Sequence, residues 1–135
     1  MTKKIDEIEG IGPKYAEALS TASVTTVEQL LSAGGSKNGR KALAEKSGLS
    51  ETLILKWVNM ADLFRIKGVA SQFAELLHAA GVDTVKELRT RNSENLAAKM
   101  AEVNGEMKLT RVVPSVKVVD GWIALANELP PAVTH

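Results

Sequence analysis

Apolar residues recur along this chain at the spacing of helix faces. Tyr15, Ala18, Leu19 and Ala22 follow an i, i+3, i+4, i+7 pattern. A longer segment repeats that spacing at Leu53, Ile54, Trp57, Met60, Ala61 and Phe64. Such positions share one face of a helix, which can then bury against a core. The pattern predicts an all-α protein.

Short polar signals mark where these helices begin and end. Residues 13–22 form the first helix after a short turn at residues 3–9, and Thr26-Val27-Glu28-Gln29 matches a capping box that opens the next helix. Gly48 is placed to end a helix over residues 40–47. Ser50 is a favourable N-cap for the helix that contains Trp57.

The chain then repeats itself, with Gly68 standing 58 positions after Gly10. At this offset Ile8, Gly10, Ile11, Tyr15, Leu19, Val24, Thr26 and Leu30 match Ile66, Gly68, Val69, Phe73, Leu77, Val82, Thr84 and Leu88. Later positions match at an offset of 65, so that Ser50 and Trp57 face Ser115 and Trp122. The second copy therefore has an insertion, which lies between Asn92 and Pro114.

The repeat predicts two tandem helical units that form one compact body. We place the first unit at residues 1–64 and the second, more degenerate unit at residues 65–129. The proline-containing segment 130–135 lacks a helical pattern and is predicted to be a mobile tail.

Each unit begins with a glycine turn that leads into a helix. In the first, Gly10 and Gly12 bracket Ile11, Pro13 occupies the first helical position, and Lys14 follows. We expect the glycines, Gly12 included, to adopt positive φ angles. The start of a helix leaves N–H groups without partners, so the turn is a candidate anion site.

Composition and charge narrow the possible functions. The 135 residues include no cysteine, which excludes disulfides, thiolate metal sites and thiol nucleophiles. Seventeen basic and sixteen acidic side chains are interspersed, giving a net charge of +1, so phosphate binding has to come from local geometry. No apolar run is long enough to cross a bilayer, and no secretory signal is evident. We expect a cytoplasmic protein without a membrane partner.

Residues 8–19 resemble the helix-hairpin-helix motif, in which apolar-Gly-apolar-Gly-x-Lys joins two helices. The whole chain also resembles a bacterial family known as domain of unknown function 4332, described as helix-hairpin-helix-like. The resemblance implies two SAM-domain-like helical units. It also implies that a nucleic-acid phosphate is bound, without sequence reading, by backbone N–H groups at Gly10, Ile11 and Gly12 together with Lys14.

We call residues 8–15 the first hairpin and residues 66–73 the second hairpin. The second has Ala70 in place of Gly12 and Gln72 in place of Lys14. Arg65 and Lys67 stand where the first hairpin has Glu7 and Glu9. Lys67 and Gly68 are therefore added to the candidate nucleic-acid-binding residues.

Other side chains leave alternatives open. The cluster Lys37, Arg40, Lys41 and Lys46 is either a second phosphate-facing patch or a solvated helix face. Tyr15, Phe73, Trp57 and Trp122 could stack on bases, but their repeat-matched positions favour core packing. His78 has one acidic neighbour at helical spacing, Glu75, and no histidine neighbour, and a single such pair is too small a ligand set, so we expect no metal site and no cofactor.

No nucleophile–base–orienter set can be assembled from these residues, so we expect no enzymatic activity. The sequence favours a binding module that contacts duplex DNA phosphates weakly, without sequence specificity, through the Gly10–Gly12 turn. The alternative is a protein-interaction or scaffolding module with the same fold. The oligomeric state is not indicated by the sequence.

Overall fold

A computed structural model describes residues 3–134, and within them every regular element is a helix, apart from one isolated antiparallel bridge between Lys4 and Thr26. The predicted all-α class is confirmed. The described chain divides into two compact units, which are residues 3–62 with 132–134 and residues 63–131. The division falls after Asp62, two residues before the predicted boundary. That the units form one body stays a prediction.

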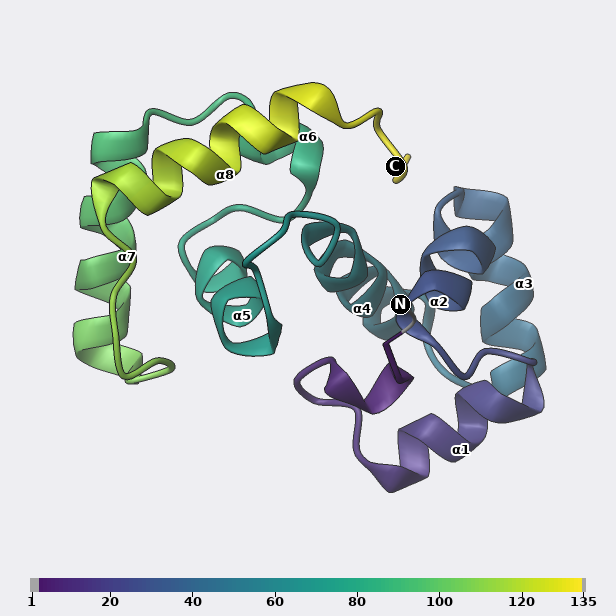
Figure 1. Ribbon diagram of the computed structural model, residues 1–135. Helices are drawn as coiled ribbons and strands as arrows, with labels where there is room; N and C mark the ends of the chain where they lie inside the picture. The colour runs from purple at the N-terminus through teal and green to yellow at the C-terminus, as the bar shows by residue number, and fades with distance from the viewer. Residues whose placement is uncertain (1–2, 135) are drawn as a thin grey trace. The chain divides into compact units, whose positions relative to one another are not determined.

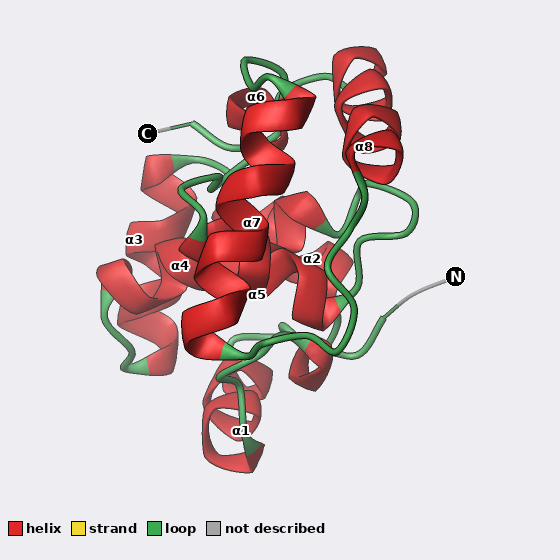
Figure 2. Cartoon of the chain, turned by 90° about the vertical axis from the view of Figure 1, so that its left-hand side faces the viewer, coloured by secondary structure: helices red, strands yellow, loops and turns green. Residues whose placement is uncertain are grey.

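Four α-helices follow one another in the same order in both halves of the chain, and unit 1 has a 3-10 helix in addition (Figures 1 and 2). Unit 1 contains the 3-10 helix η1 (Ile5–Glu7), then α1 (Pro13–Thr21), α2 (Val27–Gly34) and α3 (Lys37–Ser47), and α4 (Glu51–Leu63) leads to the boundary. Unit 2 contains α5 (Ser71–Ala79), α6 (Val85–Leu88), α7 (Ser93–Met107) and α8 (Val116–Glu128).

Matching hydroxyl side chains cap matching helices. The Thr26 hydroxyl accepts a hydrogen bond from the Gln29 N–H at 3.1 Å, and its counterpart Thr84 accepts one from Glu87 at 3.2 Å. Ser50 and Ser115 cap α4 and α8 in the same way. These contacts satisfy N–H groups that a helix leaves open at its start. The predicted N-caps are confirmed, whereas the reciprocal half of the capping box is not formed, because Gln29 Oε1 accepts from the N–H of Thr25 at 2.8 Å instead of from that of Thr26.

The core of each unit is built from repeat-matched apolar residues. Leu19, Leu30 and Trp57 are buried in unit 1, and Leu77, Leu88 and Trp122 are buried in unit 2. Burial of such side chains is the main favourable contribution to the folding of a helical unit.

Helix α3 begins at Lys37, earlier than the predicted start at residue 40. The Ser36 hydroxyl accepts a hydrogen bond from the Gly39 N–H at 3.0 Å and so caps the additional turn. The periodicity of apolar residues misses this turn because its residues, Lys37-Asn38-Gly39, are polar or lack a side chain.

Arg40 belongs neither to a phosphate-facing patch nor to a solvated face. Its side chain is only 4% exposed. One guanidinium nitrogen donates to the carbonyl oxygens of Gly34 and Gly35 at 2.9 and 3.1 Å, and another donates to Thr134 at 2.6 Å. A buried cation at the end of α2 thus satisfies the carbonyl groups that the helix leaves open.

The described part of the C-terminal tail differs from the predicted mobile segment. Val133 is buried, and the Thr134 N–H donates to the Gly35 carbonyl at 2.8 Å. Together with Arg40, these contacts hold residues 132–134 against the α2–α3 junction. Sequence patterns could not predict this contact, because a short segment without helix or strand is positioned only by the tertiary structure around it.

The predicted insertion lies in the second copy of the α3–α4 region. Helix α7 has 15 residues where α3 has 11. Three residues, 48–50, connect α3 to α4, whereas eight residues, 108–115, connect α7 to α8. The predicted position of the insertion, between Asn92 and Pro114, is confirmed.

Candidate nucleic-acid interface

The first hairpin is a tight turn held by its own backbone. The N–H of Ile11 donates to the carbonyl of Ile8 at 3.1 Å, and both side chains are buried. Gly10 between them has a φ of +93°, a left-handed conformation that an L side chain rarely adopts. Glycine is therefore required at position 10 by the turn itself.

Gly12 does not have the positive φ angle that we expected. Its φ of −86° and ψ of −174° are those of an extended residue, and a Cβ atom built on it would meet no heavy atom within 4 Å. It is the N-cap of α1, and Pro13 follows it as the first helical residue. The prediction for Gly12 is wrong because only one residue of the turn needs the left-handed conformation.

The start of α1 presents unpaired backbone donors. The N–H groups of Gly12, Lys14 and Tyr15 find no acceptor among residues 3–134, and no side chain caps this helix. Gly12, Pro13, Lys14 and Tyr15 are all exposed. Free N–H groups combined with the positive end of the helix dipole favour an anion here.

Ile11 is placed differently from what the motif implies. Its N–H is already bonded to Ile8, and its side chain is 4% exposed. Ile11 therefore anchors the turn, and the donors come from Gly12 and the two residues after Pro13. Tyr15, whose N–H the sequence analysis did not single out, joins the candidate site.

A tryptophan lies behind the first hairpin. A Cβ atom on Gly10 would stand 3.8 Å from the indole Nε1 of Trp57, which is itself buried. The rings of Trp57 and Tyr15 pack with centroids 5.1 Å apart at an interplanar angle of 59°. Such tilted aromatic pairs stabilise beyond their buried area. Tyr15 keeps 37% of its surface exposed, so it is only partly a core residue.

The second hairpin has the same backbone. Gly68 has a φ of +96°, the Val69 N–H donates to Ile66 at 3.0 Å, and Ala70 is the extended N-cap of α5 with a φ of −97°. Because Gly12 is extended as well, alanine at position 70 leaves the turn unchanged. The N–H groups of Ala70 and Gln72 find no acceptor in the described chain.

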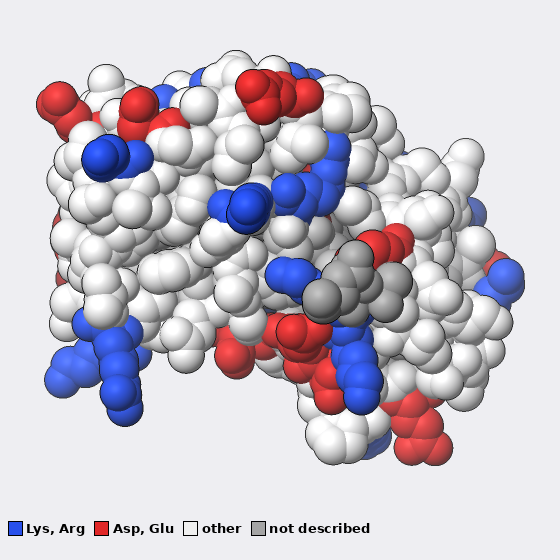
Figure 3. All heavy atoms as spheres, viewed as in Figure 1, with Lys and Arg blue, Asp and Glu red and all other residues white. Residues whose placement is uncertain are grey.

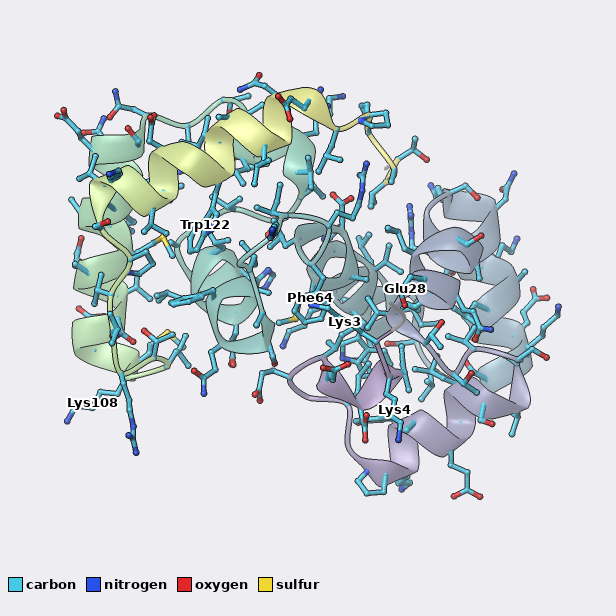
Figure 4. All side chains as sticks on the ribbon, viewed as in Figure 1. Lys3, Lys4, Glu28, Phe64, Lys108 and Trp122 are labelled. Atoms are coloured by element: carbon cyan, nitrogen blue, oxygen red, sulfur yellow. The ribbon has the colours of Figure 1, made fainter. Side chains whose placement is uncertain are left out.

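The tryptophan contact also recurs in unit 2. A Cβ atom on Gly68 would lie 3.3 Å from Nε1 of Trp122, and the Phe73 ring packs 5.4 Å from the Trp122 ring. Figure 4 labels Trp122 between α8 and α5. The glycine, the aromatic residue at the helix start and the tryptophan thus form one structural set that both units contain.

The charged side chains near the two hairpins differ. Lys14 is exposed on α1, close in sequence to the exposed Glu7 and Glu9. Lys67 is exposed beside Gly68, while Arg65 donates to the carbonyl of Pro130 at 2.6 Å. The first hairpin therefore combines open donors with mixed charge, and the second combines open donors with one exposed lysine.

His78 has a partner that the sequence analysis missed. Its Nδ1 lies 3.1 Å from a carboxylate oxygen of Asp83, five residues later, across the end of α5. A search at helical spacing could not find this pair because the chain leaves the helix between the two residues. In the described part of the chain, no group of three or more histidine, aspartate or glutamate side chains could hold a metal ion.

Comparison with known proteins agrees with the resemblance seen in the sequence. Residues 9–129 match the family described as Domain of unknown function (DUF4332). No solved structure matches the chain. None of the helices in residues 3–134 is long and apolar enough to span a membrane. Since the match covers most of the chain, from residue 9 of the first hairpin to the end of α8, the chain belongs to the DUF4332 family.

Proposed function

We propose that the protein is a non-catalytic binding module that contacts nucleic-acid phosphates through its first hairpin without reading sequence. The turn resembles a helix-hairpin-helix, which implies that backbone N–H groups bind the phosphate. Open donors at a helix start fix the position of a phosphate but contact no base edge. The module would therefore bind duplexes of different sequence alike.

One observation supports this proposal above the others. Three N–H groups at the start of α1, those of the exposed residues Gly12, Lys14 and Tyr15, have no acceptor among residues 3–134. Other helices of the chain have a capping side chain that accepts from such an N–H group, as Thr26 and Ser115 do for α2 and α8, whereas α1 has none. Lys14 adds a positive charge beside the open donors.

The second hairpin supports a second, similar contact. Its backbone repeats the first, and the N–H groups of Ala70 and Gln72 have no acceptor in the described chain. Lys67 is the exposed cation nearest to it in the sequence. We expect each hairpin to contribute one or two phosphate contacts.

Binding would be weak. Lys and Arg are interspersed with Asp and Glu on the face seen in Figure 3, and the net charge is only +1. About two to four phosphate contacts predict a log–log slope of affinity against salt of roughly −2 to −4. Such a module would assist a larger assembly rather than hold nucleic acid alone.

Fluorescence anisotropy with a labelled 20-base-pair duplex, titrated at several salt concentrations, tests the proposal. Lys14→Ala should lower the salt slope by about one unit for every duplex sequence. Lys46→Ala, which removes an exposed lysine from α3 far along the sequence, is the matched control and should change little. No salt-dependent binding of any duplex at low ionic strength would overturn the proposal.

A protein-interaction or scaffolding role is the second candidate, and one observation favours it. The basic cluster of α3 has one cation fewer for a phosphate, because Arg40 is buried against three carbonyl groups while Lys37, Lys41 and Lys46 stay exposed. If Lys14→Ala binds duplexes as the wild type does, the scaffolding role becomes the better account.

A further inference from the structure

The insertion in unit 2 adds residues that the repeated fold does not require. Unit 1 joins α3 to α4 with three residues, so the longer α7 and its eight-residue connection to α8 are additions to a fold that closes without them. We call residues 107–118, from the end of α7 to the first turn of α8, the basic lobe.

Hydrogen bonds within the basic lobe and to the end of α7 hold its backbone in place. The buried side chain of Asn104 donates to the carbonyl of Thr110 at 3.0 Å and accepts from its N–H at 2.9 Å. The Thr110 hydroxyl donates to the carbonyl of Val112 at 2.9 Å, and Pro114 is buried. A connection fixed in this way presents its side chains in one arrangement, which lowers the entropy cost of binding.

Positive charge is concentrated on the basic lobe. Lys108, Arg111 and Lys117 are exposed, and residues 107–118 contain no Asp or Glu. None of the three forms an ion pair with a described residue. Figure 4 shows the Lys108 side chain extending away from α7, and Figure 3, in the same view, shows blue surface at this place.

Exposed apolar side chains are concentrated there too. The large exposed apolar residues of residues 3–134 are six in number, and four of them belong to the lobe. These are Met107 at 55%, Val112 at 70%, Val116 at 43% and Val118 at 45% exposure. Single exposed apolar residues are common on proteins, but four within twelve consecutive residues, along a connection that runs beside α7 (Figure 1), indicate an interaction surface.

Comparison with unit 1 shows that several lobe residues do not favour stability. Lys108 has a φ of +52° at the end of α7, where the equivalent residue of α3 is Gly48. Val116 is exposed where unit 1 has Glu51. Lys117 lies in the first turn of α8, at the end of the helix dipole that disfavours a cation.

We infer that the basic lobe docks on an anionic lipid surface, with Val112 and its apolar neighbours entering the interface while Lys108, Arg111 and Lys117 contact headgroups. Cations that flank projecting aliphatic side chains suit this interface, where both kinds of group are satisfied. The four cavities lined by Gly35, Arg40, Lys4 and Asn95 with their neighbours do not include lobe residues, and the exposed side chains of the lobe are what it offers to a partner.

This inference goes beyond the proposed function and does not depend on it. The sequence-based expectation of no membrane partner rested on the lack of a spanning segment, whereas a peripheral contact needs none. Three cations are fewer than the four to eight that mark strong recognition of anionic lipid, so the contact is weak and reversible.

Co-sedimentation of the whole chain with lipid vesicles tests the inference. The wild type should partition onto phosphatidylcholine vesicles that contain about 30% phosphatidylglycerol, but not onto pure phosphatidylcholine. Replacing Lys108, Arg111 and Lys117 by glutamine should lower the partition coefficient by about tenfold or more. Val112→Ser should lower it by about threefold, because less apolar surface enters the interface.

The matched control replaces Lys37, Lys41 and Lys46, which are exposed on α3, by glutamine and so removes the same charge from unit 1. It should change partitioning by less than about twofold. An equal loss in both triple variants, no wild-type preference for anionic vesicles, or an unchanged Val112→Ser variant would each overturn the inference. Loss of duplex binding in the lobe variant with unchanged vesicle binding would assign the lobe to nucleic acid instead.

Discussion

The two hairpins share a backbone but differ in the side chains around it. Both have a left-handed glycine, at Gly10 and Gly68, followed by an extended N-cap and backed by a tryptophan. They differ in that Lys14 is matched by Gln72. The shared features are those that the turn requires, and the differing ones are those that a bound phosphate would contact.

The comparison also shows which glycine of the motif is structural. Gly12 and Ala70 have nearly the same φ and ψ angles, so the second glycine of the motif is not needed to make the turn. Loss of that glycine in unit 2 is therefore no sign of a degenerate turn. Any functional difference between the hairpins has to come from charge.

The largest effects are expected from the two tryptophans. Trp57→Ala and Trp122→Ala should each lower the free energy of unfolding by about 3–5 kcal/mol, because each leaves a cavity behind its hairpin. Urea denaturation followed by circular dichroism measures this loss. Since each unit contains one of the two tryptophans, the fluorescence of Trp57→Phe and Trp122→Phe reports on the units separately. If either substitution lowers the free energy of unfolding by less than about 1 kcal/mol, the tryptophan would not support its hairpin as the structure indicates.

Substitutions of the hairpin glycines are expected to have intermediate effects. Gly10→Ala and Gly68→Ala should each lower the free energy of unfolding by about 1–2 kcal/mol because of their positive φ angles. Gly68→Ala should be the worse of the two, since its Cβ would stand closer to the tryptophan, at 3.3 against 3.8 Å. Gly12→Ala, the control, should stay within about 0.5 kcal/mol. If thermal melts show that Gly12→Ala destabilises the protein as much as the other two, the conclusion that only Gly10 and Gly68 are required by the turns would be wrong.

Substitutions of the left-handed residues that end α3 and α7 are expected to change the free energy of unfolding in opposite directions. Lys108→Gly should raise the free energy of unfolding by about 0.5–1 kcal/mol, because the left-handed conformation suits glycine. Gly48→Ala should lower it by a similar amount. Chemical denaturation of both variants decides the matter, and a destabilised Lys108→Gly would mean that the lysine stabilises the fold after all.

The smallest effects concern the exposed lysines of the hairpins. Lys14→Ala and Lys67→Ala should each reduce the salt slope of duplex binding by about one unit. Their unfolding midpoints should stay at the wild-type value, since both side chains are exposed. Equal losses would make the hairpins equivalent, whereas a loss in Lys14→Ala alone would confine the contact to unit 1.

Local signals in the sequence predicted much of the fold. The caps at Thr26, Thr84, Ser50 and Ser115 and the glycine at the end of α3 act within a few residues, so pattern alone finds them. The repeat also located the insertion. Arg40 could not be placed, because its burial depends on carbonyl groups of α2 and on Thr134, which lies 94 positions away.

The candidate site was only partly predictable. Gly10 and Lys14 were found by the motif, but the division of roles between Gly10 and Gly12 depends on φ angles, which the sequence does not determine because glycine adopts either sign of φ. The exposed N–H of Tyr15 follows from where α1 begins. The basic lobe was visible in the sequence only as an insertion, since its exposure and internal hydrogen bonds are tertiary features.

Titration of the 15N-labelled protein with a short duplex, followed by amide chemical shifts, tests the central claim most directly. Each proposed donor, at Gly12, Lys14 and Tyr15, has its own resonance, and Gly12 falls in the glycine region of the spectrum. The account predicts that these three amides shift first, and that those of Ala70 and Gln72 follow if the second hairpin binds. Unchanged shifts at the start of α1, with the largest changes on α3 or the basic lobe, would contradict it.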